Sequence, residues 1–215
     1  MICVSLQEKN FQQCMELIRR FECCEIRLDL CRFSCNEIRV LFASHPRLVA
    51  TCRPTDTGDE ERKKILFCAI EAGAAYVDIE MESSLSFKMD IIHKAREHRC
   101  ATILSYHNYE YTPPATMLEN IIEEGFSHGV DVVKIATYVR VERDNAALMS
   151  VYGKGRRLIV FGMGEKGMIT RVAAPLLGAE FTFACVDEDS ATAPGQIPYE
   201  RLKKIYQLMQ PDSSL

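Results

Sequence analysis

A lysine interrupts the apolar segment DVVKIATYV, which spans residues 131–139. Valine, isoleucine and alanine flank Lys134, at a point where a soluble protein normally carries another aliphatic residue. A neutral lysine amine can form a Schiff base with a ketone or an aldehyde, and the resulting iminium withdraws electrons from the adjacent C–H bond. Burial and nearby cations would both favour the neutral amine. Lys134 is therefore a candidate nucleophile, and the competing interpretation is a strand-end lysine that extends its charge to solvent.

A histidine suited to proton transfer ends the segment ATILSYH, residues 101–107. The reference pKa of a histidine side chain, about 6.5, lets it accept and return a proton at neutral pH. His107 is therefore the candidate general base and acid, and the alternative is a histidine that only satisfies hydrogen bonds. The other histidines fall in segments predicted as helices or loops: His45, His93, His98 and His128.

Three arginines, Arg27, Arg53 and Arg171, indicate an anionic substrate, because the guanidinium fork matches a carboxylate or a phosphate. The segment FGMGEKG, residues 161–167, opens a predicted helix and is a weak candidate phosphate cradle, since it matches neither a P-loop nor GxGxxG. The segment SATAPGQIP, residues 190–198, follows the last predicted strand, where barrel enzymes carry lids or specificity loops. Its glycine and prolines alone would predict only a turn.

Short β-branched segments alternate with longer segments of helical period along the chain. The predicted strands are residues 2–6, 24–30, 47–53, 75–80, 101–107, 130–137, 157–163 and 181–185. The predicted helices are residues 8–21, 35–43, 58–72, 84–98, 114–127, 141–152, 167–177 and 198–209. Eight βα units in 215 residues predict an α/β fold, a (β/α)8 TIM barrel, as a single domain over residues 1–210 with a tail at 211–215. Counting alone does not distinguish this barrel from an open doubly wound sheet.

Several predicted strands carry charges on one face. In CEIRLDL the aliphatic side chains share a face, so the period of two places Glu25 and Arg27 on the other. The same alternation turns Arg53, Asp78 and Glu80 inward from neighbouring strands. Charges inside a barrel are costly unless they are paired or bind a ligand. The set favours an active site at the C-terminal ends of the strands, and the alternative is a structural network that ties strands together.

The composition restricts the class of molecule that the protein is expected to bind and the cellular compartment in which it is expected. A net charge of −4 gives no basic nucleic-acid footprint, so a small-molecule substrate is the expected partner. No apolar run approaches the ~20 residues of a membrane-spanning helix. The ten cysteines are scattered through apolar segments, with no secretory signal and no paired CxxC spacing. We therefore expect reduced thiols in a cytoplasmic protein and no metal site.

Taken together and in order, these segments resemble the type I 3-dehydroquinate dehydratases of the shikimate pathway. The matching segments are ICVSL, EIRLDL, TCR, SYHN, VVKIA, FGMGEKGMITR and TAPGQIP, and they run over essentially the whole chain. The resemblance implies an eight-stranded barrel, usually a homodimer. It also implies a lyase that dehydrates 3-dehydroquinate to 3-dehydroshikimate without metal or organic cofactor.

The resemblance assigns roles by position. Lys134 resembles the Schiff-base lysine, His107 the general base and acid, and Arg171 the arginine that holds the substrate carboxylate. The residues that resemble groups orienting the substrate or closing the site are Glu25, Arg27, Arg53, Gln196 and, on a shorter motif, Ser5. Thr192 stands where a serine is usual, which keeps the hydroxyl and adds a methyl group.

One departure concerns the histidine. After the strand-three arginine the family commonly has a glutamate followed by Gly-Gly, and that carboxylate positions the histidine. This chain reads RPTDTGDEE, with Thr57 at the expected place. Either Asp56 or Asp59 replaces the glutamate, or the histidine is oriented otherwise.

Other interpretations remain open. A class I aldolase acting on a sugar phosphate would use a similar lysine and would need a phosphate site at the loops after the last two strands. A barrel that serves only as a binding module would not need both Lys134 and His107. The dehydratase family also occurs fused ahead of a shikimate dehydrogenase domain, and the residues leave open whether this chain is half of such a fusion.

Overall fold

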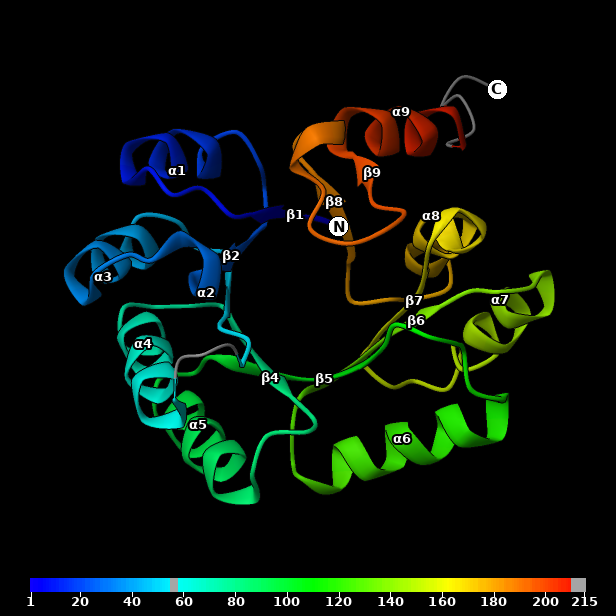
Figure 1. The fold of residues 1–215 in the computed structure, drawn as a ribbon, viewed down its shortest axis with the longest axis horizontal. Helices are drawn as coiled ribbons and strands as arrows, with labels where there is room; N and C mark the ends of the chain where they lie inside the picture. Colours follow the sequence, from blue (N-terminus) through cyan, green and yellow to red (C-terminus); the bar gives the residue numbers. More distant parts are fainter. Residues whose placement is uncertain (55–57, 210–215) are drawn as a thin grey trace.

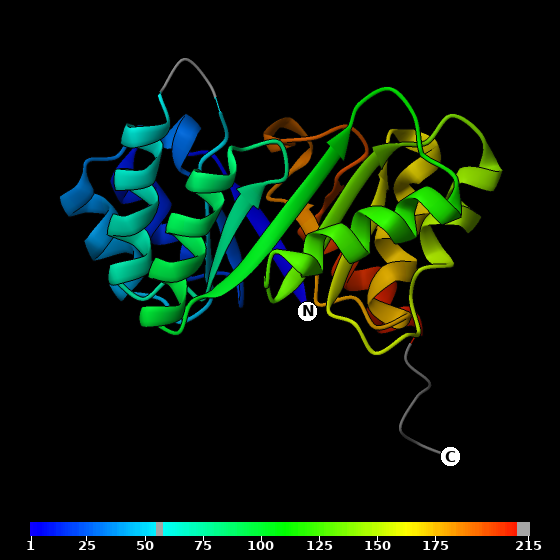
Figure 2. The same cartoon turned by 90° about the horizontal axis from the view of Figure 1, so that it is seen from below.

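A computed structural model describes residues 1–54 and 58–209 of the chain. Parallel strands surround a central axis, and helices cover their outer side (Figures 1 and 2). The strands are β1 (Ile2–Leu6), β2 (Cys24–Arg27), β3 (Leu48–Thr51), β4 (Tyr76–Glu80), β5 (Ala101–Asn108), β6 (Val132–Tyr138), β7 (Leu158–Met163), β8 (Thr182–Cys185) and β9 (Ile197–Pro198). The helices are α1 (Phe11–Ile18), α2 (Leu28–Cys31), α3 (Cys35–Ala43), α4 (Asp59–Glu71), α5 (Leu85–Glu97), α6 (Ala115–Ser127), α7 (Glu142–Met149), α8 (Met168–Leu176) and α9 (Tyr199–Met209). The predicted (β/α)8 barrel is confirmed.

The strand order is β7-β6-β5-β4-β3-β2-β1-β8-β9, and neighbouring strands are parallel. Within the described residues no ladder joins β7 to β8, so this boundary is held differently. At its lower end the Glu180 N–H donates to the Leu158 carbonyl oxygen, at 2.9 Å. Midway, the Phe161 and Phe183 rings meet edge to face, with centroids 6.0 Å apart. The barrel is thus closed here by side chains and isolated backbone bonds.

Residue alternation divides the barrel into two cores. The outward side chains of the strands, such as Val4, Ile26 and Val133, pack against the helices in the main core. The inward side chains at the base of the barrel are apolar and form a second core: Cys3, Cys23, Val49, Ile103, Val132, Ala136, Ile159, Phe161, Met163, Phe181 and Phe183. Above this base the inward positions of β1 to β5 are polar, whereas on β6 and β7 the apolar side chains of Ala136, Phe161 and Met163 reach the cavity. The predicted facing of Glu25, Arg27, Arg53, Asp78 and Glu80 follows this rule.

Among the strands and α-helices of the described residues, two short elements were not predicted, α2 and β9. The expected strand 24–30 ends at Arg27, and the chain turns into α2 at Leu28. This turn lets the Arg27 guanidinium donate two hydrogen bonds to the Asp29 carboxylate, at 3.1 and 2.7 Å. The other element is β9, two residues that pair with β8 inside the segment predicted as a loop. The predicted tail, residues 211–215, lies outside the described residues.

The prediction that all cysteines are reduced thiols is wrong for one pair. Cys35, the first residue of α3, forms a disulfide with Cys68 of α4, and their Cα atoms are 5.8 Å apart. The two residues are 33 positions apart in the sequence, and only the packing of α3 against α4 brings them together. The other eight cysteines are buried free thiols. In addition, none of the helices described here is long and apolar enough to cross a membrane.

Candidate active site

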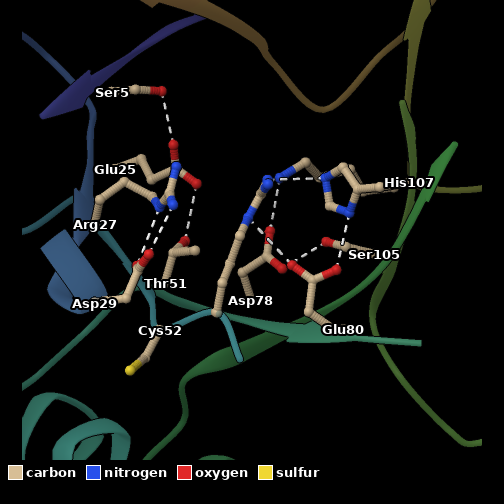
Figure 3. A network of polar contacts seen from close by, with 12 residues as sticks. Ser5, Glu25, Arg27, Asp29, Thr51, Cys52, Asp78, Glu80, Ser105 and His107 are labelled. Carbon is tan, nitrogen blue, oxygen red and sulfur yellow. Dashed lines mark hydrogen bonds and ion pairs between the residues drawn. The ribbon is translucent and has the colours of Figure 1, made fainter. Parts of the chain in front are cut away.

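Inward polar side chains of strands β1 to β6 meet above the apolar base of the barrel, and Figure 3 shows those of β1 to β5. Register places them at similar heights, because Ser5 pairs with Glu25, Thr51 with Asp78, and Ser105 with both Glu80 and Lys134. Figure 3 shows Asp78 and Glu80 reaching from β4 toward Ser105 and His107 on β5. The site is therefore built on strand ends, which hold side chains more rigidly than loops.

Lys134 is buried on β6 and pairs with a buried carboxylate. Its Nζ donates a hydrogen bond to Asp78 Oδ2 at 2.8 Å, and the two side chains are 4% and 1% exposed. Burial alone would raise the pKa of Asp78, but the Lys134 charge and the hydrogen bonds from Lys134 and Ser105 outweigh it, and the pKa is lowered. The amine also lies over the Phe183 ring, 4.5 Å from its centroid. Lys134 therefore does not extend to solvent in this structure.

His107 is held on both ring nitrogens. Its Nδ1 lies 2.9 Å from Glu80 Oε2, and its Nε2 lies 2.9 Å from Nη2 of Arg53. Arg53 also forms an ion pair with Glu80 at 3.2 Å and donates to the Tyr109 hydroxyl at 2.7 Å. The pKa of Arg53 is raised, because the charges of Glu80 and other nearby acids outweigh the opposing effect of burial. The Tyr109 ring is stacked parallel to the imidazole.

A second carboxylate network lies on the opposite side of the barrel mouth. Glu25 accepts hydrogen bonds from the Ser5 hydroxyl at 2.7 Å and from the Thr51 hydroxyl at 2.9 Å. Arg27 stands beside it and binds Asp29. Burial would lower the pKa of Arg27, but the hydrogen bonds that Arg27 donates to Asp29 and the charge of Glu25 outweigh this effect, and the pKa is raised. Glu25 and Arg27 thus present an acceptor and a donor side by side.

Arg171 in α8 is a buried cation without a carboxylate partner among the described residues. Its side chain is fully buried, and its one hydrogen bond there, from Nη2 to the Pro194 carbonyl oxygen, is long at 3.4 Å. Nε and Nη1 have no partner within the described part of the chain. Burial lowers the pKa of Arg171 to about 10, so the guanidinium is still charged at neutral pH. A buried cation with unused donors is chemically suited to binding an anion.

The predicted lid segment is folded over this mouth. Gln196 Oε1 accepts from the Thr192 N–H at 2.7 Å, and Gln196 Nε2 donates to the Ser5 hydroxyl at 3.4 Å. The Gly164 N–H after β7 donates to the Pro194 carbonyl oxygen at 3.1 Å. That amide belongs to the predicted phosphate cradle, and in this structure it binds the loop instead.

One cavity of about 30 Å³ joins these groups. It is lined by Ser5, Glu25, Arg27, Arg53, His107, Tyr109, Lys134, Ala136, Phe161, Met163, Arg171, Phe183, Thr192, Ala193 and Gln196. All nine residues predicted to be catalytic or to bind substrate are among them, whereas the inward charges of Asp78 and Glu80 lie behind the lining and Asp59 lies away from it. Sequence reasoning missed Tyr109, whose only signal is that it lies two residues after His107, on the same face.

The acid beside His107 differs from both candidates offered by the sequence. Glu80 contacts the ring. Asp59 lies at the start of α4 and pairs with Arg62 at 2.8 Å. Asp56 and Thr57 lie outside the described residues. Across residues 1–54 and 58–209, no group of three or more His, Cys, Asp or Glu side chains is arranged to hold a metal ion.

Comparison with known proteins identifies the family to which this chain belongs. The family model described as type I 3-dehydroquinase matches residues 2–213. The chain belongs to the type I 3-dehydroquinase family. The 3-dehydroquinate dehydratase of Desulfotalea psychrophila is 34% identical over 219 residues, which cover 95% of this chain and 96% of that protein. The Pyrococcus abyssi enzyme of the same name is 32% identical, covering 86% of each. Membership of this family confirms the prediction of a lyase.

Solved structures of the family share the barrel. The Aquifex aeolicus 3-dehydroquinate dehydratase superposes with a TM-score of 0.80 at 25% identity, covering 98% of this chain and 99% of that one. The Clostridium difficile enzyme, solved with covalently modified comenic acid, gives a TM-score of 0.84 at 20% identity, covering 97% and 91%. A two-domain dehydroquinate dehydratase and shikimate dehydrogenase from S. pombe gives 0.81 at 21% identity, with 97% of this chain covering 44% of that one. The last two similarities show the fold alone.

The buried Asp78–Lys134 pair predicts a pH-dependent loss of stability. Asp78→Asn should lower the free energy of unfolding by about 3–5 kcal/mol at neutral pH, because the buried ammonium loses its partner. The pKa of Asp78 is lower in the folded than in the unfolded protein, where it is ~3.9. The stabilisation is therefore present above about pH 4 and is lost as the pH falls further.

Chemical denaturation of both proteins between pH 7 and pH 3 measures this effect. The difference in unfolding free energy should shrink below about pH 4. The matched control is Asp90→Asn, which breaks an exposed pair with Lys63 and should cost less than about 1 kcal/mol. A difference for Asp78→Asn that stays constant down to pH 3 would contradict the assignment.

Proposed function

We propose that this protein dehydrates 3-dehydroquinate to 3-dehydroshikimate in the shikimate pathway, through a Schiff base on Lys134 with His107 as general base and acid. The observation that carries the proposal is one cavity lined by a buried amine, an imidazole and a buried arginine that has no carboxylate partner in the described part of the chain. A ketone, an acidic C–H bond and a carboxylate on one substrate match these three groups. Family membership supports the substrate.

The first step joins Lys134 to the ketone. The neutral amine adds to the carbonyl carbon, and loss of water from the carbinolamine leaves an iminium. The Lys134 ammonium must first give up a proton, and Asp78 holds that ammonium in the resting site. After the iminium forms, its N–H bears the positive charge at the same position, so Asp78 again faces a cation. The carboxylate thus keeps a partner through both states.

The second step is elimination. His107 removes a proton from the carbon next to the iminium carbon, and the electron pair forms an enamine. The hydroxyl one carbon further leaves as water, with the proton that His107 returns. Water then hydrolyses the conjugated iminium, which releases the enone product and the free amine. The balance is one water lost from the substrate, with no oxidant or reductant.

The binding residues match a hydroxylated carboxylic acid. Two Arg171 nitrogens have no partner among the described residues and can bind the carboxylate, since a guanidinium binds such a group through two nitrogens. Glu25 and Arg27 offer an acceptor and a donor to ring hydroxyls, and Arg53 supplies a further cation. Ser5, Thr192 and Gln196 close the site through the loop.

A cavity of about 30 Å³ holds roughly one water molecule, whereas the substrate is a substituted six-membered ring. The loop that carries Thr192 and Gln196 must therefore open to admit it, and Arg53 must move away from the imidazole. In this structure both are in place over the cavity. We infer that this conformation is the closed form of the site.

The sugar-phosphate aldolase alternative receives no specific support. Barrels named 3-hexulose-6-phosphate synthase also superpose, at TM-scores of 0.63 and 0.62, but at 17% and 18% identity they show the fold alone. The Gly164 amide that a phosphate would use is taken by Pro194. The homodimer and the cytoplasmic location remain predictions, and light scattering on the purified protein measures the former.

Reductive trapping tests the Schiff base. The protein incubated with 3-dehydroquinate and borohydride should gain the mass of one reduced ligand on the peptide that contains Lys134. Lys134→Ala should abolish the adduct, while the exposed Lys154→Ala should leave it unchanged. Absence of both an adduct and the absorbance of the conjugated enone in the wild-type protein would refute the dehydratase function.

His107→Ala separates imine formation from elimination. The variant should still be trapped by borohydride, because Lys134 and its partner Asp78 remain. Turnover should fall at least ~100-fold, since general acid–base groups typically contribute 10²- to 10⁴-fold. Absorbance of the enone product follows the rate, and unchanged turnover would remove His107 from the mechanism.

Substitution of Gly195 tests whether docking of the loop at residues 190–198 contributes to substrate binding. Its backbone has φ of 75°, and a Cβ there would collide with the Gly164 carbonyl oxygen, so Gly195→Ala should prevent the loop from docking. We expect KM for 3-dehydroquinate to rise about tenfold, the equivalent of one or two lost hydrogen bonds. The matched control is Gly155→Ala, which carries a similar φ of 68° in open space and should leave KM unchanged. Equal effects of the two variants would show that strain, not docking, is responsible.

A further inference from the structure

The last residue of β4, Glu80, makes two contacts that no sequence motif indicates. Its side chain is 11% exposed and bridges two neighbours. Oε2 lies 2.9 Å from His107 Nδ1, and Oε1 lies 3.2 Å from Arg53 Nε. The neighbouring inward residue of the same strand, Asp78, binds Lys134. The two carboxylates of β4 therefore reach the amine and the imidazole separately.

The arginine on the other side of the ring determines where the histidine proton lies. A guanidinium has only hydrogen-bond donors. Because Arg53 Nη2 lies 2.9 Å from His107 Nε2, that ring nitrogen must be the acceptor. The single proton of the neutral ring is then on Nδ1, from which it is donated to Glu80. This tautomer is assigned from the contacts of both nitrogens.

The consequence for proton transfer is direct. In this neutral tautomer Nε2 is the only basic atom of the ring. Its lone pair points to the side of the cavity that Arg53 occupies before substrate enters. When Nε2 takes a proton, the ring becomes a cation, and the Glu80 carboxylate already faces its other N–H. The same carboxylate holds Arg53 by its Nε, so Nη2 can leave the imidazole while the arginine stays anchored.

We propose that Glu80 is the positioning residue of His107, holding the imidazole as the Nδ1–H tautomer with Nε2 free to act as the base, in the place that the sequence offered to Asp56 or Asp59. This inference rests on the proposed function, because it assigns a role within that reaction. Asp59 is directed to Arg62 at the start of α4 and lines no part of the cavity.

Kinetics of one variant and one matched control test the role. Glu80→Gln keeps the shape and the acceptor but removes the charge, and it should lower kcat about 10- to 100-fold, part of what the acid–base group supplies. Borohydride trapping at Lys134 should persist, so the loss lies after imine formation. The matched control Asp59→Asn should keep kcat within about twofold of the wild type.

A spectroscopic measurement separates orientation from general damage. In ¹⁵N-histidine-labelled protein, with His107 identified by its absence in His107→Ala, Nε2 should give a pyridine-type and Nδ1 a pyrrole-type resonance. Glu80→Ala removes both the acceptor of the Nδ1 proton and the carboxylate that anchors Arg53, so the ring should shift toward the other tautomer, whereas Asp59→Asn should leave it unchanged. Circular dichroism of each variant verifies folding, and the near-isosteric Glu80→Gln keeps the test decisive if Glu80→Ala does not fold.

The possible outcomes separate a failure of the role proposed for Glu80 from a failure of the proposed dehydratase function. Wild-type kcat in Glu80→Gln, or an equal loss in Asp59→Asn, would overturn the role of Glu80 while leaving the dehydratase intact. A wild-type protein that neither turns over nor is trapped would overturn the proposed function. In that case the resonances of His107 would still decide whether Glu80 sets its tautomer.

Discussion

Desolvation of charge governs the architecture of this barrel mouth. Lys134, Asp78, Glu80, Arg53 and Arg171 are all removed from most of their water, and each isolated charge would cost several kcal/mol. Most of these charges are offset by an opposite charge within contact distance, as in the 2.8 Å pair between Lys134 on β6 and Asp78 on β4. Arg171 is the exception, and its lack of a partner among the described residues is the feature that most directly indicates an anionic ligand.

The apolar base of the barrel makes these contacts rigid. Below the polar residues, inward aromatic and aliphatic side chains fill the interior, and Phe183 and Phe161 extend this layer upward to face Lys134 and Arg171. A side chain at the boundary between an apolar and a polar layer has few alternative positions. The amine and the guanidinium therefore point into the cavity instead of folding back along the strands.

Alternation along strands predicted most of the site. The period of two placed Glu25, Arg27, Asp78 and Glu80 inward because the outward positions are aliphatic and must meet helices. The segment after β3 was less accessible to this reasoning, since an irregular loop has no period. The acid beside His107 was sought there, whereas a neighbouring strand supplies it.

Other features depend on tertiary packing that no local pattern encodes. The disulfide joins two residues on adjacent helices whose sequence neighbours carry no pairing signal. The helix α2 replaces the end of a predicted strand, where the Arg27–Asp29 contact and the burial of Leu28 override the alternation of aliphatic and charged residues in CEIRLDL. Family resemblance was more informative than periodicity for the loop residues Thr192 and Gln196.

The boundary between β7 and β8 differs from the other strand boundaries of the barrel. Seven of its eight strand boundaries are hydrogen-bonded ladders, which resist stretching, and the eighth is not a ladder in the described chain. Arg171 follows β7, and the loop that carries Thr192 and Gln196 follows β8, so residues that line the cavity stand on both sides of this boundary. A ligand that contacts residues on both sides would connect β7 and β8, which no ladder joins in the described residues. Ligand binding would then be coupled to the closure of the barrel.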